Sequence, residues 1–592
     1  MNMCGIAGYV GNRNAPEVLF DMLKRLEYRG YDSAGIACIS DQDVVIFKDR
    51  GRVDEIRESA GYERILSDIG IAHTRWATHG EPSEWNAHPH SDCTNGFIVV
   101  HNGIIENYRD LREGLMESGH RFESETDTEV VPHLIEELYT KSFEVAFREA
   151  IKKLRGSFAI AAISTHEPDK ILIARKESPL IVGLGDGENF IASDTPAILP
   201  NTRRILIMDD FDYGIVTKDR VKIKDIRTGD EIKKEIQTIQ WSMEQAERGG
   251  YPHFMLKEIF EEPEAVKNAT KAIKEIEDIA KKLTGYKRIY FVACGTAYHA
   301  GLLGKYLLER FSIPSEAAVA SEFRYSTVNT IDSDCAVIAI SQSGETADTL
   351  ASVKEAKNKG AYILSIVNVV GSTLTRISDD NIYIYSGPEI AVASTKAYLG
   401  QLTAITLLGL YLAKESGRIE MDYVNEIIDD INNLPGKIRQ ILNNEDEIKK
   451  LARRLANKDT FFYIGRRLNY PTALEGALKI KEISYVHAEA YPAGELKHGP
   501  LALLEDGIPV VAINPNDDLF RKMESNIQEA RARKATIIVV GENGDLKTPV
   551  IDPLLSPILY IVPLHLFAYH ISVLRGLDPD KPRNLAKSVT VE

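Results

Sequence analysis

The chain has 592 residues, of which 44% are hydrophobic and 27% charged, a composition typical of globular domains and not of a disordered protein. The formal net charge of −16 argues against a nucleic-acid partner, because no basic surplus is available to neutralise phosphates. At roughly 150 residues per domain, the length indicates about three or four domains.

The five cysteines include no CxxC pair, which excludes a zinc ribbon or a thioredoxin motif and suits a reducing cytosol. The first twenty residues lack the basic start and apolar stretch of a signal peptide. We therefore expect a cytoplasmic protein without a membrane partner.

Residues 1–240 are expected to form one domain of mostly short strands with some helices. Strand-like runs rich in Ile, Val and Phe occur at 70–77, 96–101, 157–164 and 170–175. Helical patterns occur at 17–27 and 129–138. The charged stretch 241–284 is interpreted as a connector with the first helix of the next part.

After residue 285 the pattern changes to alternating strands and helices. Apolar runs lie at 288–293, 335–340 and 361–367, and similar runs follow about 173 residues later at 461–465, 508–514 and 535–540. Helical stretches between the runs predict parallel strands with crossover helices, so each set indicates a doubly wound α/β domain. The constant offset favours an internal duplication, at 285–430 and 431–581, over a coincidence between two generic domains.

An apolar run at 556–574 is about long enough to span a bilayer. Pro563, His565 and His570 interrupt it, so we expect a buried strand that runs into a buried helix. The polar residues 576–592 should form an extended tail.

Cys4 stands at the head of a Cys-Gly-Ile-Ala-Gly segment. A cysteine at a mature N-terminus can act as a nucleophile and use its own α-amine, with a pKa of about 8, as the base. The alternative is a buried structural cysteine, the commoner role of the residue.

Four further segments decide between these readings, at 28–35, 73–80, 101–107 and 124–129. With the Cys4 segment they closely resemble the glutamine amidotransferase domains of the N-terminal-nucleophile type. The resemblance implies an α+β fold in which two sheets lie between helical layers, an αββα sandwich.

The resemblance also implies roles for individual residues. Cys4 would be the nucleophile, and the Asn102 side chain with the Gly103 N–H would form the oxyanion hole. Arg75 would bind the glutamine carboxylate and Asp127 its ammonium group. The glutamine-binding residues implied are Arg75, Trp76, Thr78, His79 and Asp127, with Trp76 near the exit for ammonia.

Three histidines, His79, His88 and His90, raise the question of a metal, but their spacing is not decisive and we expect no metal. One departure from the family pattern is that Met1-Asn2-Met3 precede Cys4. Translation from Met3, trimming, or an inactive domain would each account for it, and we expect a mature chain that begins at Cys4.

The hydroxyl-rich loop 341–346 follows the apolar run 335–340 and precedes a helix. Backbone N–H groups, hydroxyls and the helix dipole make such a loop a cradle for phosphate. It lacks the lysine of a Walker loop, and the alternative is a simple helix cap.

Further segments lie at 293–296, 389–396, 473–482, 494–500 and 582–592. With the phosphate loop they closely resemble paired sugar-isomerase (SIS) domains. Together with the amidotransferase segments, the likeness extends over essentially the whole chain, to a family of two-site synthases.

The resemblance implies a reaction that turns fructose 6-phosphate and glutamine into glucosamine 6-phosphate and glutamate, with no cofactor. Glu482 would move a proton from C1 to C2, His498 would assist ring opening, and Lys587, on the active-site tail 582–592, would contact the substrate. The sugar-phosphate-binding residues implied are Thr296, Ser341, Gln342, Ser343, Thr346, Val392 and Lys479. A homodimer and an internal route for ammonia are also implied.

Two alternatives come from other classes. A glutamine phosphoribosyl amidotransferase shares the N-terminal segments but needs a diphosphate-binding loop after paired acidic residues, which we do not find. A non-enzymatic sugar-phosphate sensor would have no need of Glu482, His498 or an N-terminal nucleophile.

Overall fold

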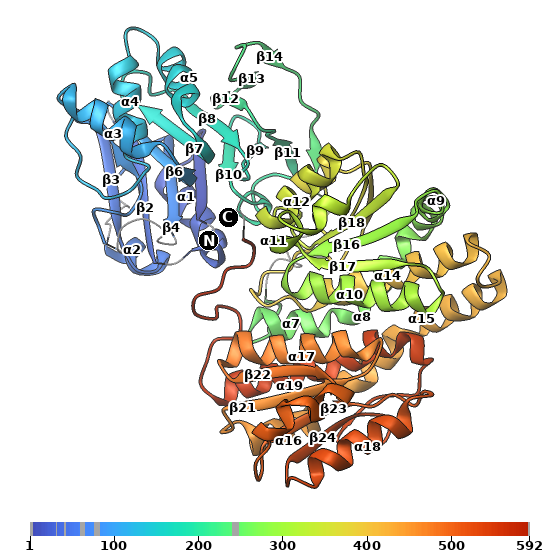
Figure 1. The fold of residues 1–592 in the computed structure, drawn as a ribbon. Coiled ribbons are helices and arrows are strands. Elements are labelled where there is room, and N and C mark those ends of the chain that lie inside the picture. Colours follow the sequence, from blue (N-terminus) through green and yellow to red (C-terminus); the bar gives the residue numbers. More distant parts are fainter. Residues whose placement is uncertain are drawn as a thin grey trace. The chain divides into compact units, whose positions relative to one another are not determined.

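The computed structural model describes residues 4–30, 32–40, 43–59, 65–75, 83–239 and 248–589 (Figure 1). The chain divides into two units, Met1–Met243 with Ala586–Glu592, and Glu244–Leu585. The first division falls close to the end of the predicted domain at residue 240. The tail Ala586–Glu592 belongs to the first unit by its packing.

Two antiparallel sheets form the centre of the first unit. Across the described residues, one sheet has the order β15 (Gln237–Thr238), β11 (Arg204–Ile207), β9 (Ile181–Leu184), β10 (Asn189–Ala192), β1 (Gly5–Val10), β4 (Ile69–Arg75), β2 (Ser33–Ser40), β3 (Asp43–Arg50). The other has the order β14 (Glu231–Ile232), β13 (Val221–Asp225), β12 (Asp212–Val216), β8 (Ile171–Lys176), β7 (Gly156–Ser164), β6 (Phe97–Ile105), β5 (His90–Ser91). The predicted strands at 70–77, 96–101, 157–164 and 170–175 are confirmed as β4, β6, β7 and β8.

The two faces of β6 explain how the layers are built. Ile98 and Val100 belong to a core between the two sheets, whereas Phe97 and Val99 belong to a core shared with α4 (Val130–Leu138) and α5 (Phe143–Lys153). Side chains of a strand alternate between its faces, so one strand serves both cores. Helix α1 (Ala15–Leu26) packs on β1 and β4 of the other sheet. The expected αββα sandwich is confirmed.

The second unit contains two parallel sheets of the same design. The first has the order β17 (Ser315–Val319), β16 (Arg288–Ala293), β18 (Cys335–Ser341), β19 (Tyr362–Val367), β20 (Asp380–Tyr383). The second has the order β22 (His487–Pro492), β21 (Thr460–Gly465), β23 (Pro509–Ile513), β24 (Thr536–Gly541), β25 (Leu546–Lys547). Equivalent strands occupy equivalent places, which confirms the repeated doubly wound layout.

One large hydrophobic core lies between the two sheets and their helices. Phe291 of β16 and Tyr463 of β21 both belong to it, and the alternate residues Val292 and Phe462 face smaller cores on the outer sides. The helices of this unit are α7 (Phe254–Phe260), α8 (Glu262–Ala269), α9 (Ile273–Leu283), α10 (Gly295–Arg310), α12 (Ala347–Asn358), α14 (Lys396–Glu415), α15 (Met421–Leu442), α16 (Glu445–Leu455), α17 (Asn469–Ser484), α18 (Phe520–Arg531) and α19 (Ser556–Leu574), besides shorter ones. The described part of the segment 241–284 thus contributes α7, α8 and α9, with the short helix η4 (Thr270–Ala272) between the last two, and the predicted division at 430/431 falls inside α15.

The apolar run at 556–574 is one helix, α19, so the strand predicted for its first part is wrong. Pro563 lies inside the helix, where it removes one backbone donor, but burial of almost every side chain of α19 outweighs that loss. The helix is long and apolar enough to cross a membrane, yet 89% of its apolar window is buried inside the protein. It is a core helix of the second unit.

Candidate active sites

The first candidate site lies where Cys4 precedes β1. Asn102 on β6 donates its Nδ2 hydrogens to the carbonyl oxygen of Cys4 and to Ser193 Oγ, both at 2.9 Å. The next residue, Gly103, has φ +129°, and a Cβ there would collide with the carbonyl oxygen of Ser157. The backbone can therefore take this path only with glycine. Both amide hydrogens of Asn102 are engaged, so one of these two bonds must break before Asn102 can donate to another oxygen.

His73 on β4 fixes the orientation of the Asn102 amide. Its Nε2 lies 3.0 Å from Asn102 Oδ1 and 3.0 Å from the carbonyl oxygen of His101. Burial lowers the pKa of His73 to about 3, so the ring is neutral at pH 7. Because both partners are acceptors, the proton must sit on Nε2. The ring of His88 stacks on His73 at 4.1 Å, in agreement with a structural role for His88.

Two buried charged groups accompany this site. Asp127 accepts the N–H of Ile105 at 2.7 Å, and Arg75 ends β4. Burial lowers the pKa of Arg75, while the nearby charges of Cys4 and Asp127 counteract that effect. A cation and an anion near Cys4 suit a substrate that carries both a carboxylate and an ammonium group. Trp76, Thr78 and His79 lie outside the described residues.

The second candidate site begins at the loop after β18. Ser341 Oγ accepts the N–H of Gly344 at 3.0 Å and lies 3.0 Å from Thr346 Oγ1. Gly344 has φ +66°, and a Cβ there would collide with Ser372 Oγ. The loop is thus folded tightly by its own hydroxyls and leads directly into α12. Gln342, Ser343 and Thr346 are half-buried beside the buried Ser341.

Thr296 and this loop flank the point where the strand order reverses. The chain passes from β16 to β17 on one side and then to β18 on the other. Thr296 lies in the first turn of α10, just after β16, and Ser341 ends β18. Crevices at the carboxyl ends of two such strands are the usual ligand sites of doubly wound sheets.

Helix α17 of the second sheet carries three charged residues, Glu475, Lys479 and Glu482, which lie on one face because of their spacing. The Nζ of Lys479 lies 3.1 Å from Glu475 Oε1 and 2.7 Å from Glu482 Oε2. It also donates to Thr296 Oγ1 at 3.0 Å, which joins this helix to the first sheet's crevice. The structure therefore brings Thr296, Lys479 and Glu482 together.

Lys479 and Glu475 are completely buried and both remain charged. Burial alone would raise the pKa of Glu475, but the charge of Lys479 and a hydrogen bond from His299 at 2.7 Å lower it to about 2. Burial would lower the pKa of Lys479, and the two carboxylates raise it instead. Glu475 was given no role in the sequence analysis, although it lies within the segment 473–482.

The remaining predicted residues lie on other segments. The N–H of Val392 donates to the carbonyl oxygen of Asp580 at 3.1 Å. His498 is exposed at the end of the short helix η6 (Ala493–His498), and within the described chain no hydrogen bond joins it to Glu482. Lys587 lies in the tail that belongs to the first unit. The roles of these three residues stay predictions.

Comparisons with known proteins identify the families that both parts of the chain resemble. A glutamine amidotransferase domain model matches residues 73–200, and a SIS domain model matches residues 282–411 and 454–545. The glutamine–fructose-6-phosphate aminotransferases (isomerizing) of Thermococcus kodakarensis and Pyrococcus horikoshii are each 53% identical to this chain, over 100% of both proteins. The C-terminal domain of the glucosamine-fructose-6-phosphate aminotransferase from Francisella tularensis covers 57% of this chain and 100% of its own length, with 40% identity and a TM-score of 0.54.

Because these relatives match it along its whole length at about half of its positions, the chain belongs to the family of glutamine–fructose-6-phosphate aminotransferases (isomerizing).

Proposed function

We propose that this enzyme converts fructose 6-phosphate and glutamine to glucosamine 6-phosphate and glutamate. The observation that carries the proposal is the buried Lys479, which connects Thr296 beside the phosphate loop with the carboxylate of Glu482. This contact places the phosphate loop 341–346 and the carboxylate of Glu482, which can transfer protons, at the same crevice. The activity in the names of the full-length relatives supports the same reaction.

In the first unit, the Cys4 thiolate would attack the side-chain amide of glutamine. Arg75 would hold the carboxylate of the substrate and Asp127 its ammonium group, with Trp76, Thr78 and His79 completing the pocket. Asn102 and the N–H of Gly103 would stabilise the oxyanion, a contribution of about 2.7–4 kcal/mol for one donor in other enzymes. Ammonia would leave, and water would then release glutamate from Cys4.

In the second unit, Ser341, Gln342, Ser343 and Thr346 would hold the phosphate. Ammonia would add to C2 of the opened sugar, and the C2 oxygen would leave as water to give an imine. Glu482 would then take the proton from C1 and return it to C2, which leaves the amine at C2 and an aldehyde at C1. Lys479 would face developing negative charge on the sugar oxygens. Thr296 and the backbone at Val392 would position the sugar, and His498 would assist ring opening. Lys587, on the tail 582–592, would contact the substrate.

The test is to mix purified protein with glutamine and fructose 6-phosphate and to measure both products. Equal amounts of glutamate and glucosamine 6-phosphate are expected. Glutamate without amino sugar would favour another amidotransferase, and neither product would favour a sugar-phosphate sensor. With amide-¹⁵N glutamine and unlabelled ammonium in the buffer, label retained in the amino sugar would support an internal route for ammonia.

We propose that the mature chain begins at Cys4. The base would be the α-amine of Cys4 itself, and this amine is free only when no residue precedes Cys4. Intact-mass measurement of active protein from its native source tests this. The expected mass lacks Met1-Asn2-Met3, and full activity with these residues retained would contradict it.

We further propose that the second unit comprises two domains, at 285–430 and 431–581. We also propose that the enzyme is cytoplasmic and binds neither nucleic acid nor membrane.

We propose that the enzyme is a homodimer. The resemblance of the isomerase domains supports the dimer. Light scattering at micromolar concentration should give twice the chain mass of 66.0 kDa. A single-chain mass under these conditions would contradict the dimer.

A further inference from the structure

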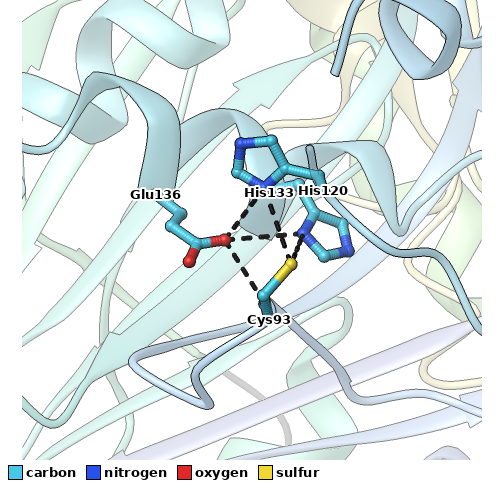
Figure 2. Close-up of side chains that lie close together, drawn as sticks. All are labelled: Cys93, His120, His133 and Glu136. Carbon is cyan, nitrogen blue, oxygen red and sulfur yellow. Dashed lines mark hydrogen bonds and ion pairs between the residues drawn. The ribbon is translucent and has the colours of Figure 1, made fainter. Parts of the chain in front are cut away.

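Four side chains that can bind a metal converge in the first unit (Figure 2). Cys93 lies in the turn between β5 and β6, His120 follows α3 (Tyr108–Glu117), and His133 and Glu136 lie on α4. Each offers one ligand atom, and these atoms all lie within 4.8 Å of one another. The proposed glutaminase mechanism uses none of these residues.

Four distances within the group are close to the edges of a metal tetrahedron. With Zn–S of about 2.3 Å and Zn–N or Zn–O of about 2.0–2.1 Å, neighbouring ligand atoms lie about 3.3–3.6 Å apart. Cys93 Sγ is 3.7 Å from His120 Nδ1 and 3.5 Å from His133 Nδ1. Glu136 Oε2 is 3.0 Å from His120 Nδ1 and 3.6 Å from His133 Nδ1. The ligand atoms all lie within 4.8 Å of one another, so side-chain adjustment would close the group around one ion.

The outer nitrogens of the two rings face carboxylates. His120 Nε2 lies 3.1 Å from Glu137 Oε2, and His133 Nε2 lies 3.8 Å from Glu129 Oε1. Glu129 is itself fixed by the N–H groups of Glu123 and Ser124, at 2.7 and 2.8 Å. The carboxylate of Glu137 can orient the His120 ring and increase its basicity, as the second layer of a metal site usually does, whereas Glu129 lies beyond hydrogen-bond distance of His133.

The arrangement around His120 is electrostatically unfavourable for a neutral ring alone. If Nε2 donates its proton to Glu137, the lone pair of Nδ1 points at the carboxylate of Glu136, 3.0 Å away. A cation at the centre removes this conflict and would bind Cys93 as the thiolate, with release of its proton.

We propose that Cys93, His120, His133 and Glu136 bind one zinc ion in a closed structural site. One sulfur, two nitrogens and one oxygen at tetrahedral distances suit zinc better than calcium or magnesium, which prefer oxygen ligands. Four protein ligands leave no open position for catalysis. The ion would link three segments, which are the turn before β6, the segment after α3, and α4. These links would stabilise the first unit.

The test is the metal content of full-length protein without a histidine tag, expressed with added zinc and then desalted. About one zinc per chain is expected by mass spectrometry. Cys93→Ser and His120→Ala should each weaken zinc binding more than about 100-fold in a chelator competition, and Glu137→Gln about 10–100-fold. Cys38→Ala, which removes a buried thiol of the same unit, and Cys4→Ala should both keep the ion.

Cobalt provides a second measurement that does not depend on stability. Cobalt-loaded protein should show a thiolate-to-metal charge-transfer band that Cys93→Ser lacks and Cys38→Ala retains. Removal of zinc by a chelator should lower the melting temperature of the first unit. The proposal is overturned if zinc-loaded protein holds no stoichiometric metal, or if folded Cys93→Ser binds as much zinc as the parent.

Discussion

The two sheets of the second unit share one strand order but differ in the side chains at the carboxyl ends of their strands. The loop after β18 contains Ser341, Ser343 and Thr346, whereas the equivalent segment after β23 contains Asn514, Asp517 and Asp518. Hydroxyl groups and free N–H groups attract a phosphate, and paired carboxylates repel one. The cradle can therefore work only in the first copy.

The second copy contributes a different element, the helix α17 with Glu475, Lys479 and Glu482. A duplicated fold thus divides the work: one copy binds the anion, and the other supplies buried groups that hold and move protons. The fold fixes where a site can form, and the few residues that follow each strand decide what it does.

Glu482→Gln should have the largest effect, because it removes the proposed base from the second copy. Formation of amino sugar should fall about 10²–10⁴-fold, the usual contribution of a positioned base, while glutaminase activity remains. The matched control is Glu309→Gln on α10, the equivalent helix of the first copy, which should keep normal turnover. Unchanged formation of amino sugar in Glu482→Gln would show that the second copy does not supply the base.

Lys479→Met should destabilise the second unit by about 3–5 kcal/mol, because Glu475 is left as a buried charge with its main partner gone. Lys305→Met on α10 breaks a partly exposed pair with Glu309 and should cost less than about 1 kcal/mol. Denaturant unfolding of the two variants measures the difference. Equal losses of unfolding free energy in the two variants would show that the buried Lys479 pair contributes no more than a surface ion pair.

Gly344→Ala should cost about 1–3 kcal/mol through backbone strain and should also raise the KM for fructose 6-phosphate about tenfold or more. Gly360→Ala is the control, because it also has positive φ, +86°, but lies outside the phosphate loop. It should lose stability without a change in KM. Equal KM values for the two variants would argue against a phosphate cradle at 341–346.

Ionisation of Glu475 should make a smaller contribution to the stability of the second unit, which becomes measurable at acidic pH. Its folded-state pKa of about 2 lies below the ordinary value of 4.5, so its contribution to stability is complete above pH 4.5 and is lost as the pH falls toward 2. Glu475→Gln should flatten the pH dependence of the unfolding midpoint in this window, and Glu309→Gln should leave it unchanged. An unaltered slope in Glu475→Gln would show that Glu475 is not an ionised partner of Lys479.

Much of this arrangement could be predicted from the sequence because its signals are local. The alternation of apolar runs and helices indicates the two α/β domains, and the loop 341–346 carries its own cue in consecutive hydroxyl residues and Gly344. Cys4, Asn102 and Asp127 could be assigned through family resemblance. α19 was mispredicted because Pro563 suggested a break, whereas the deep burial of the helix compensates for the missing N–H.

Other features depend on contacts between distant segments. His73 on β4 and Ser193, which follows β10, both contact the Asn102 amide, and only the fold brings them to it. Cys93, His120, His133 and Glu136 come from three segments, and only the folded chain brings their ligand atoms together. The proposed zinc site therefore has no local signal in the sequence.

The central claim is that two separate sites work in one chain, and the most direct test is Cys4→Ala assayed for both half-reactions. The account predicts that glutamine hydrolysis is abolished, while the conversion of fructose 6-phosphate to glucose 6-phosphate by the second unit remains measurable. Loss of both activities in a folded Cys4→Ala protein would contradict the assignment of the two reactions to separate sites.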